Sequence, residues 1–277
     1  MLFSVLSVRS VVKTMPQLIL GFIFAVIIAF LAYKAKSLDT SGAIAATVEG
    51  TLIFGLGGWT WAILLLAFFI SSSALSKMFK ARKKDLKEKF DKGSQRDAMQ
   101  VIGNGGPAAI FAALNYFFPD ALWTWLAFAA ALAAVNADTW ATELGVLNPS
   151  QPRMITNLRQ TVEKGTSGGI SLVGTLAGLA GSALIGLLAA IFTPSGNFLP
   201  IFALVTIAGL AGALFDSYLG ATVQAIYYCP VCQKETERHP EHLCGNQTQF
   251  KRGFGWLSND WVNFACAMAG ILVALIF

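Results

Sequence analysis

The sequence predicts an all-α, polytopic transmembrane helical bundle of about eight helices. Of its 277 residues, 55 % are hydrophobic and only 13 % are charged, whereas soluble domains carry about 25 % charged residues. Apolar runs of about 20 residues recur along the chain, and this is the length of a membrane-spanning helix rather than of a barrel strand. These observations exclude a soluble enzyme, a disordered chain and a secreted disulfide scaffold. We expect residues 1–277 to form a single integral membrane domain.

Eight hydrophobic segments account for most of the chain. The first follows Arg9 and Lys13, as in a signal peptide, but it lacks a small-residue cleavage site, so we interpret it as a span. The second is rich in glycine and holds Glu49 near its middle, which favours packing against protein rather than lipid. This second segment could be re-entrant. The approximate bounds of the eight segments are 17–33, 40–57, 59–76, 98–118, 121–146, 168–192, 199–227 and 257–276.

The basic residues are concentrated in four loops. Residues 34–38, 77–97, 147–167 and 228–255 hold 18 of the 20 Lys and Arg residues. The excess of basic residues in cytoplasmic loops places these loops in the cytoplasm and explains the net charge of +5 without a nucleic-acid partner. The cations of the 77–97 loop either rest near anionic headgroups or face nucleotide or lipid phosphates. We expect an inner or plasma membrane, or a thylakoid in a photosynthetic source, with a cytoplasmic active face.

Five acidic residues fall inside the predicted spans, where an acid is costly and is a functional candidate by default. In the predicted topology all except Glu49 approach the cytoplasmic face. Asp138 and Glu143, five residues apart, would not share one helix face without local unwinding. Carboxylate and amide oxygens suit Mg²⁺, whereas a buried polar network or an ion pathway is the alternative. The predicted Mg²⁺ ligands are Asn136, Asp138, Glu143, Asp216, Asn259 and Asp260.

Two glycine-rich segments reach the same face. One contains Asn104 in the fourth span, and the other opens the sixth span at 165–169. A loop of this kind before a helix presents free N–H groups that suit phosphate oxygens, although neither segment matches the Walker pattern. The predicted phosphate-binding residues are Asn104, Arg153, Arg159, Lys164, Gly165, Thr166, Ser167, Gly168, Gly169 and Ser217.

A short cytoplasmic loop carries three of the four cysteines and both histidines of the chain. Cys229 and Cys232 have the CxxC spacing of zinc sites, and His242 with Cys244 could complete a tetrahedron. His239 is an alternative ligand, and free cytosolic thiols are the alternative to a metal site. Because four protein ligands leave no open position, we predict a structural zinc knuckle within 228–255.

The chain resembles a known integral-membrane family that includes plant phytyl-phosphate kinase. That family is distantly similar to CTP-dependent polyprenol kinases and CDP-lipid synthases. The matching motifs span residues 38–276. They are Ser41-Gly-Ala, Phe69-Ile-Ser-Ser-Ser73, Arg96-Asp97 with Gln100 to Gly106, Ala137 to Gly145, Pro152 to Thr156, Gly165 to Gly169, Asp216 to Gln224, and Trp256 to Asn263.

The resemblance implies Mg²⁺-assisted phosphoryl transfer from a nucleoside triphosphate, CTP in the first instance, to an isoprenoid monophosphate such as phytyl phosphate. The expected catalytic residues are Asp138, Glu143, Asp216 and Asp260. A cytidylyltransferase of the CDP-lipid type and a transporter that uses the acids for ion coupling remain alternatives. The sequence leaves isoprenoid chain length, CTP against ATP, and oligomeric state open. The zinc loop is not expected in every member of the family.

Overall fold

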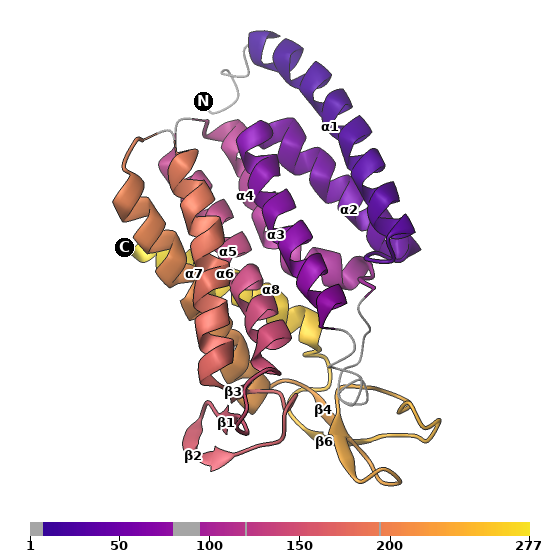
Figure 1. The fold of residues 1–277 in the computed structure, drawn as a ribbon. Helices are drawn as coiled ribbons and strands as arrows, with labels where there is room; N and C mark the ends of the chain where they lie inside the picture. The colour runs from indigo at the N-terminus through magenta and orange to yellow at the C-terminus, as the bar shows by residue number, and fades with distance from the viewer. Residues whose placement is uncertain (1–7, 80–94, 120, 194) are drawn as a thin grey trace.

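The computed structural model describes residues 8–79, 95–119, 121–193 and 195–277, with side chains from Met15 onwards. Most of the basic 77–97 loop therefore lies outside the described residues. Eight α-helices and a short π-helix, η1, form the described part of the bundle (Figure 1). Their bounds are α1 Val8–Lys34, α2 Thr40–Leu52, η1 Ile53–Gly57, α3 Trp59–Met78, α4 Ala98–Phe117, α5 Leu122–Gly145, α6 Leu172–Ile191, α7 Phe198–Thr222 and α8 Asn259–Ile276.

The helical fold class and all eight predicted segments are confirmed. Two small antiparallel sheets add to them, and both lie at the same end of the bundle (Figure 1). Their strand orders are β2-β1-β3 and β5-β4-β6. The sequence analysis did not predict these strands, because segments of two to five residues in polar loops carry too little hydrophobic alternation. The strands are β1 Arg153–Met154, β2 Asn157–Thr161, β3 Gly169–Ile170, β4 Ile226–Cys229, β5 Lys234–Thr236 and β6 Gln249–Arg252.

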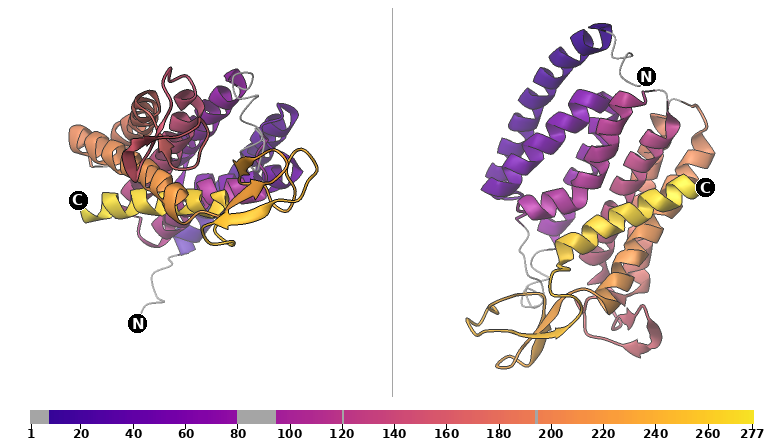
Figure 2. Two further views of the ribbon diagram at one scale, coloured as in Figure 1. Left: turned by 90° about the horizontal axis from the view of Figure 1, so that it is seen from below. Right: turned by 180° about the vertical axis from the view of Figure 1, so that it is seen from behind.

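Helix α5 forms the core of the bundle. It contacts α3, α4, α6, α7 and α8, and its residues from Ala127 to Ala137 are buried. Glycines bring the neighbouring helices close: a Cβ at Gly212 would lie 2.6 Å from the Cβ of Ala134, and one at Gly270 would lie 2.9 Å from the carbonyl oxygen of Ala130. Helix α8 crosses the bundle obliquely (Figure 2, right). This packing is the close backbone approach that small residues allow between membrane helices.

The glycine-rich second segment is a continuous helical stretch. Helix α2 continues directly into η1 and runs antiparallel to α1, since Gly50 contacts Ala25 and Gly55 contacts Leu18. The chain turns into α3 only at Gly58, whose φ of +85° suits glycine. The segment therefore runs back along α1 as far as Leu18, close to the start of the apolar part of that helix, before the chain turns. A re-entrant loop would turn back partway along.

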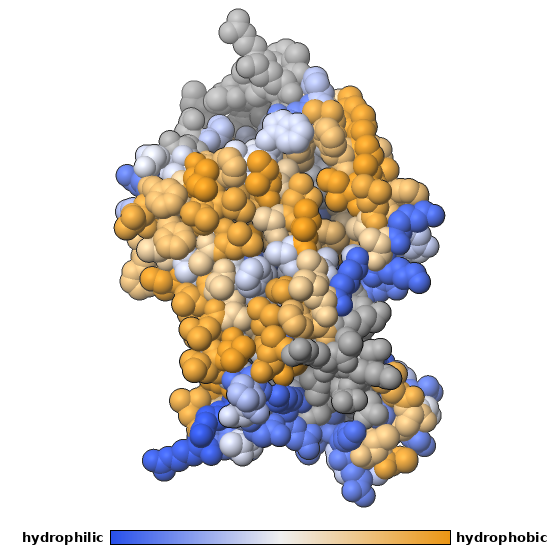
Figure 3. All heavy atoms as spheres, viewed as in Figure 1, coloured by the Kyte–Doolittle hydropathy of each residue, from blue (hydrophilic) through white to orange (hydrophobic). Residues whose placement is uncertain are grey.

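Five of the helices are long and apolar enough to cross a membrane: α1 from Met15, α3, α6, α7 and α8. Figure 3 shows a hydrophobic surface over the helices and hydrophilic residues at the end that carries the sheets. This separation suits a bundle embedded in lipid with its sheet end in water.

Candidate functional site

A cavity of about 610 Å³ lies at the sheet end of the bundle. It is bounded by α4, α5, α6, α7 and α8, by the end of α3 at Ser76, and by the two loops that carry the sheets. Most of the site residues that the sequence analysis singled out line it. These are Asn104, Asp138, Glu143, Lys164, Gly165, Thr166, Ser167, Gly168, Gly169, Asp216, Ser217, Asn259 and Asp260.

Acids from three helices meet in this cavity: Asp138 from α5, Asp216 from α7 and Asp260 from α8. Asp216 interacts electrostatically with Asp138 and with Glu237. Its Oδ2 is buried and has no hydrogen-bond partner among the described residues. Buried carboxylate oxygens need a partner, and clustered acids are the ligands that Mg²⁺ takes. The donor set therefore fits a magnesium ion.

Asp138 and Glu143 both line the cavity although α5 remains a regular helix through Gly145. The local unwinding that the sequence analysis required is absent from this described stretch. Glu143 lies close to the end of the helix, and its Oε1 accepts a hydrogen bond from Ser76 Oγ at 2.7 Å. Because α5 ends two residues later, the cavity reaches around its last turn, and both acids face it.

Asn136, a predicted metal ligand, does not line the cavity. It is fully buried. Its Oδ1 accepts hydrogen bonds from the Oγ atoms of Ser71 and Ser72, each at 3.1 Å, and its Nδ2 donates to the Gly181 carbonyl at 2.8 Å. The side chain thus joins α3, α5 and α6. This is the buried polar network between helices that was the alternative to a metal ligand for Asn136.

The glycine-rich loop is held against the end of α7. Gly165 and Gly168 have φ values of +77° and +85°, and a Cβ at Gly168 would lie 2.5 Å from the Cβ of Ala221. Ser167 Oγ donates to Gln224 Oε1 at 2.8 Å. Only glycine allows this approach without strain, so the backbone of the loop is brought to the cavity wall.

The three predicted cations near this loop lie differently. Lys164 lines the cavity, but its Nζ donates to the carbonyl oxygens of Val146 at 3.1 Å and Asn148 at 2.6 Å, which satisfies acceptors just beyond α5. Arg153 and Arg159 lie exposed on β1 and β2, outside the cavity lining, and Arg153 Nη1 donates to the Leu158 carbonyl at 2.6 Å.

Two other arginines line the cavity instead. Arg96 contacts the rings of Phe68 and Phe69, at 5.4 and 5.7 Å from the ring centroids. Burial lowers the pKa of Arg96 to about 10 and the negative charge of Glu143 opposes this, so the guanidinium stays positive at neutral pH. Arg96 is not among the predicted phosphate-binding residues. It belongs to the basic 77–97 loop, whose cations were expected either to rest near anionic headgroups or to face phosphates.

Arg238 was missed completely, because it lies inside the Cys/His loop between the two halves of the predicted metal site. Its Nε is buried and has no hydrogen-bond partner among the described residues. Glu237 beside it accepts a hydrogen bond at 2.8 Å from Gln224, which also binds Ser167. The Cys/His loop therefore contributes to the cavity wall and contacts the glycine-rich loop through Gln224.

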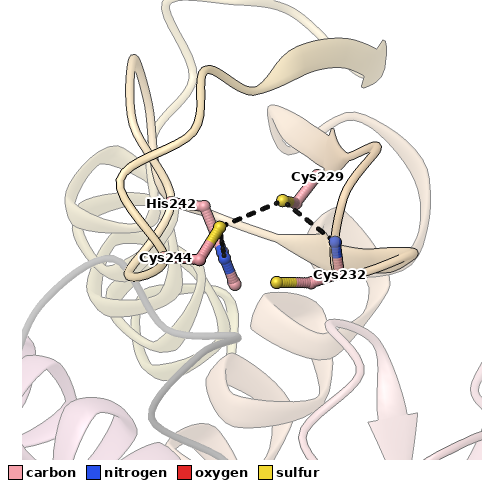
Figure 4. A group of neighbouring side chains, drawn as sticks. All are labelled: Cys229, Cys232, His242 and Cys244. Atoms are coloured by element: carbon pink, nitrogen blue, oxygen red, sulfur yellow. Dashed lines mark hydrogen bonds between the residues drawn. The ribbon is translucent and has the colours of Figure 1, made fainter.

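The Cys/His loop brings Cys229, Cys232, His242 and Cys244 together, with all ligand atoms within 4.8 Å of one another (Figure 4). The Cys229 and Cys244 sulfurs are 3.6 Å apart, and His242 Nδ1 lies 3.3 Å from the Cys244 sulfur. Ligand atoms around a tetrahedral zinc are separated by roughly 3.5–3.8 Å, so the four side chains form a cluster of the size that could hold a zinc ion. His239, the alternative ligand, stacks on Tyr227 with ring centroids 4.4 Å apart.

The thiols of this cluster have unequal acidity without a metal. Hydrogen bonds from Asn246 and His242 lower the pKa of Cys244 to about 6, whereas the hydrogen bond to Cys244 raises the pKa of Cys232 to about 12. The Cys244 thiol is therefore the more acidic of the two, and a thiolate is the form that binds metal.

Comparison with known proteins agrees with the membrane fold. A family model described as Integral membrane protein DUF92 matches residues 23–271. Protein PGR of Arabidopsis thaliana is 36 % identical over 276 residues, which cover 91 % of this chain and 93 % of the relative. A membrane protein of Methanocaldococcus jannaschii is 37 % identical over 213 residues, covering 76 % and 86 %.

Protein VTE6, chloroplastic, of Arabidopsis thaliana is 27 % identical over 246 residues, which cover 86 % of this chain and 65 % of the relative. No solved structure matches the chain. The family resemblance in the motifs is thus confirmed, and the protein belongs to the multi-pass integral membrane protein family DUF92.

Proposed function

We propose that this protein transfers a phosphoryl group from a nucleoside triphosphate, CTP in the first instance, to an isoprenoid monophosphate such as phytyl phosphate. The product is the isoprenoid diphosphate, and the active face is cytoplasmic. One observation carries the proposal: acids from α5, α7 and α8, two arginines and a glycine-rich loop line a single cavity at the sheet end. The family resemblance to plant phytyl-phosphate kinase supports the substrate class.

Positioning and charge neutralisation supply most of the catalysis in this reaction. Asp138, Asp216 and Asp260 would hold Mg²⁺, which neutralises phosphate charge. Arg96 and Arg238 bring positive charge to the same cavity. In the 165–169 loop the N–H groups of Thr166 and Gly169 donate to the carbonyls of Glu163 and Thr166. The N–H groups of Ser167 and Gly168 are therefore the ones we propose for phosphate. These groups would bind and orient the two phosphate chains.

The acceptor needs little help from a general base, because an isoprenoid monophosphate is already ionised at neutral pH. Its phosphate oxygen forms a bond to the γ-phosphorus of the nucleotide. The bond from the γ-phosphorus to the β–γ bridging oxygen breaks, and the nucleoside diphosphate leaves with that electron pair. The role of the protein is to hold donor and acceptor in line.

The test is incubation of the purified protein in detergent with phytyl, geranylgeranyl or undecaprenyl monophosphate, Mg²⁺ and each nucleoside triphosphate. We expect label from γ-labelled nucleotide in the isoprenoid diphosphate. Label from α-labelled CTP in the lipid, with release of pyrophosphate, would identify a cytidylyltransferase instead. Absence of product from every pair would reject the proposal in favour of transport.

We also propose that Cys229, Cys232, His242 and Cys244 bind a structural zinc ion. All four positions of a tetrahedron would then be filled by protein, which leaves none open for substrate. The ion would hold together the loop that presents Glu237 and Arg238 to the cavity. Metal analysis of the purified protein should find about one zinc per chain, as a single closed site requires.

A further inference from the structure

A second cavity, of about 290 Å³, lies between α1, α2 and α3 with α4 along one side. Its walls are almost entirely apolar, and small residues of α1 and α2 form one of them, including Ala25, Ala29 and Ala46. Large side chains of α3 form the opposite wall, among them Leu65 and Phe69. We call this cavity the apolar groove. None of the catalytic acids of the polar cavity lines it.

The apolar groove and the polar cavity share part of their walls. Arg96, Gln100 and Asn104 line both. A molecule with a charged head and an apolar chain can therefore place its head among the catalytic acids and its chain in the groove. This shared wall lies at the beginning of α4. Asp97 caps the helix there and accepts a hydrogen bond from the Gln100 backbone at 2.9 Å.

An aromatic cluster lies at the η1 end of the apolar groove, away from the beginning of α4. The rings of Phe24 and Trp59 are 5.5 Å apart, those of Phe54 and Trp59 are 4.6 Å apart, and those of Phe24 and Phe54 are 5.9 Å apart. All three residues line the groove. Trp59 is the first residue of α3, and Phe68, nine residues later, contacts Arg96 of the shared wall. At a rise of about 1.5 Å per residue, about 13 Å of α3 separates the aromatic cluster from the shared wall.

Glu49 places one carboxyl group in the largely apolar lining of the groove. It is only 8 % exposed and lines the groove, and its Oε1 has no hydrogen-bond partner among the described residues. Its carboxyl group packs on Gly105, the residue after Asn104, where a Cβ would leave no room for it. A buried carboxyl oxygen without a partner calls for a hydrogen-bond donor, which an ionised phosphate held in the polar cavity does not supply, so Glu49 does not identify the occupant of the groove.

We propose that the apolar groove binds the single chain of an isoprenoid phosphate whose head group occupies the polar cavity, and that Phe24, Phe54 and Trp59 limit the length of that chain. This inference rests on the proposed function for the identity of the head group. The groove volume is close to the lower end of ligand pockets, about 300–1,000 Å³, which favours one chain over the two chains of a diacyl lipid. The alanines of the wall leave room for the methyl branches of an isoprenoid.

The test compares binding of geranyl, geranylgeranyl and undecaprenyl monophosphates to the full-length protein by native mass spectrometry, without nucleotide. In Ala46→Phe the new ring fills the groove beside the shared wall, where Ala46 packs with Phe69 and Val101, and we expect about tenfold weaker binding of both geranyl and geranylgeranyl monophosphates. Ile44→Phe is the matched control, because Ile44 lies on the same helix but is exposed. In Trp59→Ala we expect binding of the undecaprenyl chain to improve relative to the geranylgeranyl chain.

Equal chain-length profiles in folded Trp59→Ala and wild-type protein, or unchanged affinity in folded Ala46→Phe, would overturn the proposal. If Ala46→Phe does not fold, a geranylgeranyl monophosphate with a photoreactive terminal group decides the question in the wild type. Cross-links near Trp59 support the groove, and cross-links confined to the outer surface overturn it. Because binding is measured without nucleotide, chain-dependent binding with no phosphoryl transfer would reject the proposed function and retain the groove.

Discussion

Small residues bring helices together in both halves of the bundle, but between α1 and α3 they also line an apolar groove. Around α5, glycines bring helices into direct backbone contact: a Cβ at Gly209 would lie 2.7 Å from the Cβ atoms of both Ala133 and Ser182. Between α1 and α3, alanines such as Ala29 line the groove. The rigid half carries Asp138, Asp216 and Asp260, whereas the half with the groove has space for an apolar chain.

This difference follows from what each half has to hold. A cluster of carboxylates stays in position only if the helices that carry it cannot move apart, and close packing provides that rigidity. A lipid chain has no directional contacts, so its site needs volume and apolar walls rather than fixed geometry. Four experiments test this contrast.

The strongest test removes one charge from the rigid half. We expect Asp216→Asn to lower kcat for isoprenoid diphosphate formation by about 10²–10³-fold, the loss typical of one group that stabilises developing charge. Tyr218→Phe, an exposed position on the same helix, is the control and should keep its activity. Unchanged synthesis by a folded Asp216→Asn protein would refute the metal site.

The second test adds volume to each half. We expect Gly209→Val to lower the free energy of unfolding by about 1–3 kcal/mol, because the added atoms meet Ala133 and Ser182 in a filled interface. Ala29→Val, in the groove wall, should stay within about 0.5 kcal/mol of the wild type. Thermal unfolding in detergent measures both, and equal destabilisation would contradict the contrast between the halves.

The third test concerns which arginines serve the cavity. We expect Arg238→Ala to raise KM for the nucleotide about tenfold, the cost of one lost charge-assisted hydrogen bond. Arg159→Ala, on the exposed strand β2, should leave KM unchanged. The reverse result would support the sequence-based assignment of Arg159 and reject the assignment based on position.

The fourth test removes the zinc site. We expect Cys232→Ser to abolish stoichiometric zinc binding, because a structural site needs all four ligands. The fall in kcat/KM should be smaller than for Arg238→Ala, about fivefold, since zinc acts on the cavity only by positioning the loop. Cys266→Ala, outside the cluster, should keep its zinc. Full zinc occupancy in Cys232→Ser would reject the site.

The sequence predicted the helices well because each one is a long apolar stretch with clear breaks. Asp97, for example, caps α4 at the expected start of the fourth segment. The sequence also predicted that Asp138, Asp216 and Asp260 would approach one face, since the number of spans between them determines the side. Of the three cations assigned to phosphate binding, only Lys164 lines the cavity. The β1–β2 hairpin carries Arg153 and Arg159 outwards, and strand pairing of this kind depends on contacts between distant residues.

The sequence by itself determined that this is a multi-pass helical membrane protein, which helices it has and which of its acids share a face. It could do so because hydropathy and charge act locally along the chain. Only the tertiary structure decided that Asn136 joins helices, that Arg238 reaches the polar cavity and that an apolar groove opens beside it. These features depend on how side chains from distant segments fill or leave space when the helices pack, and no local pattern records that.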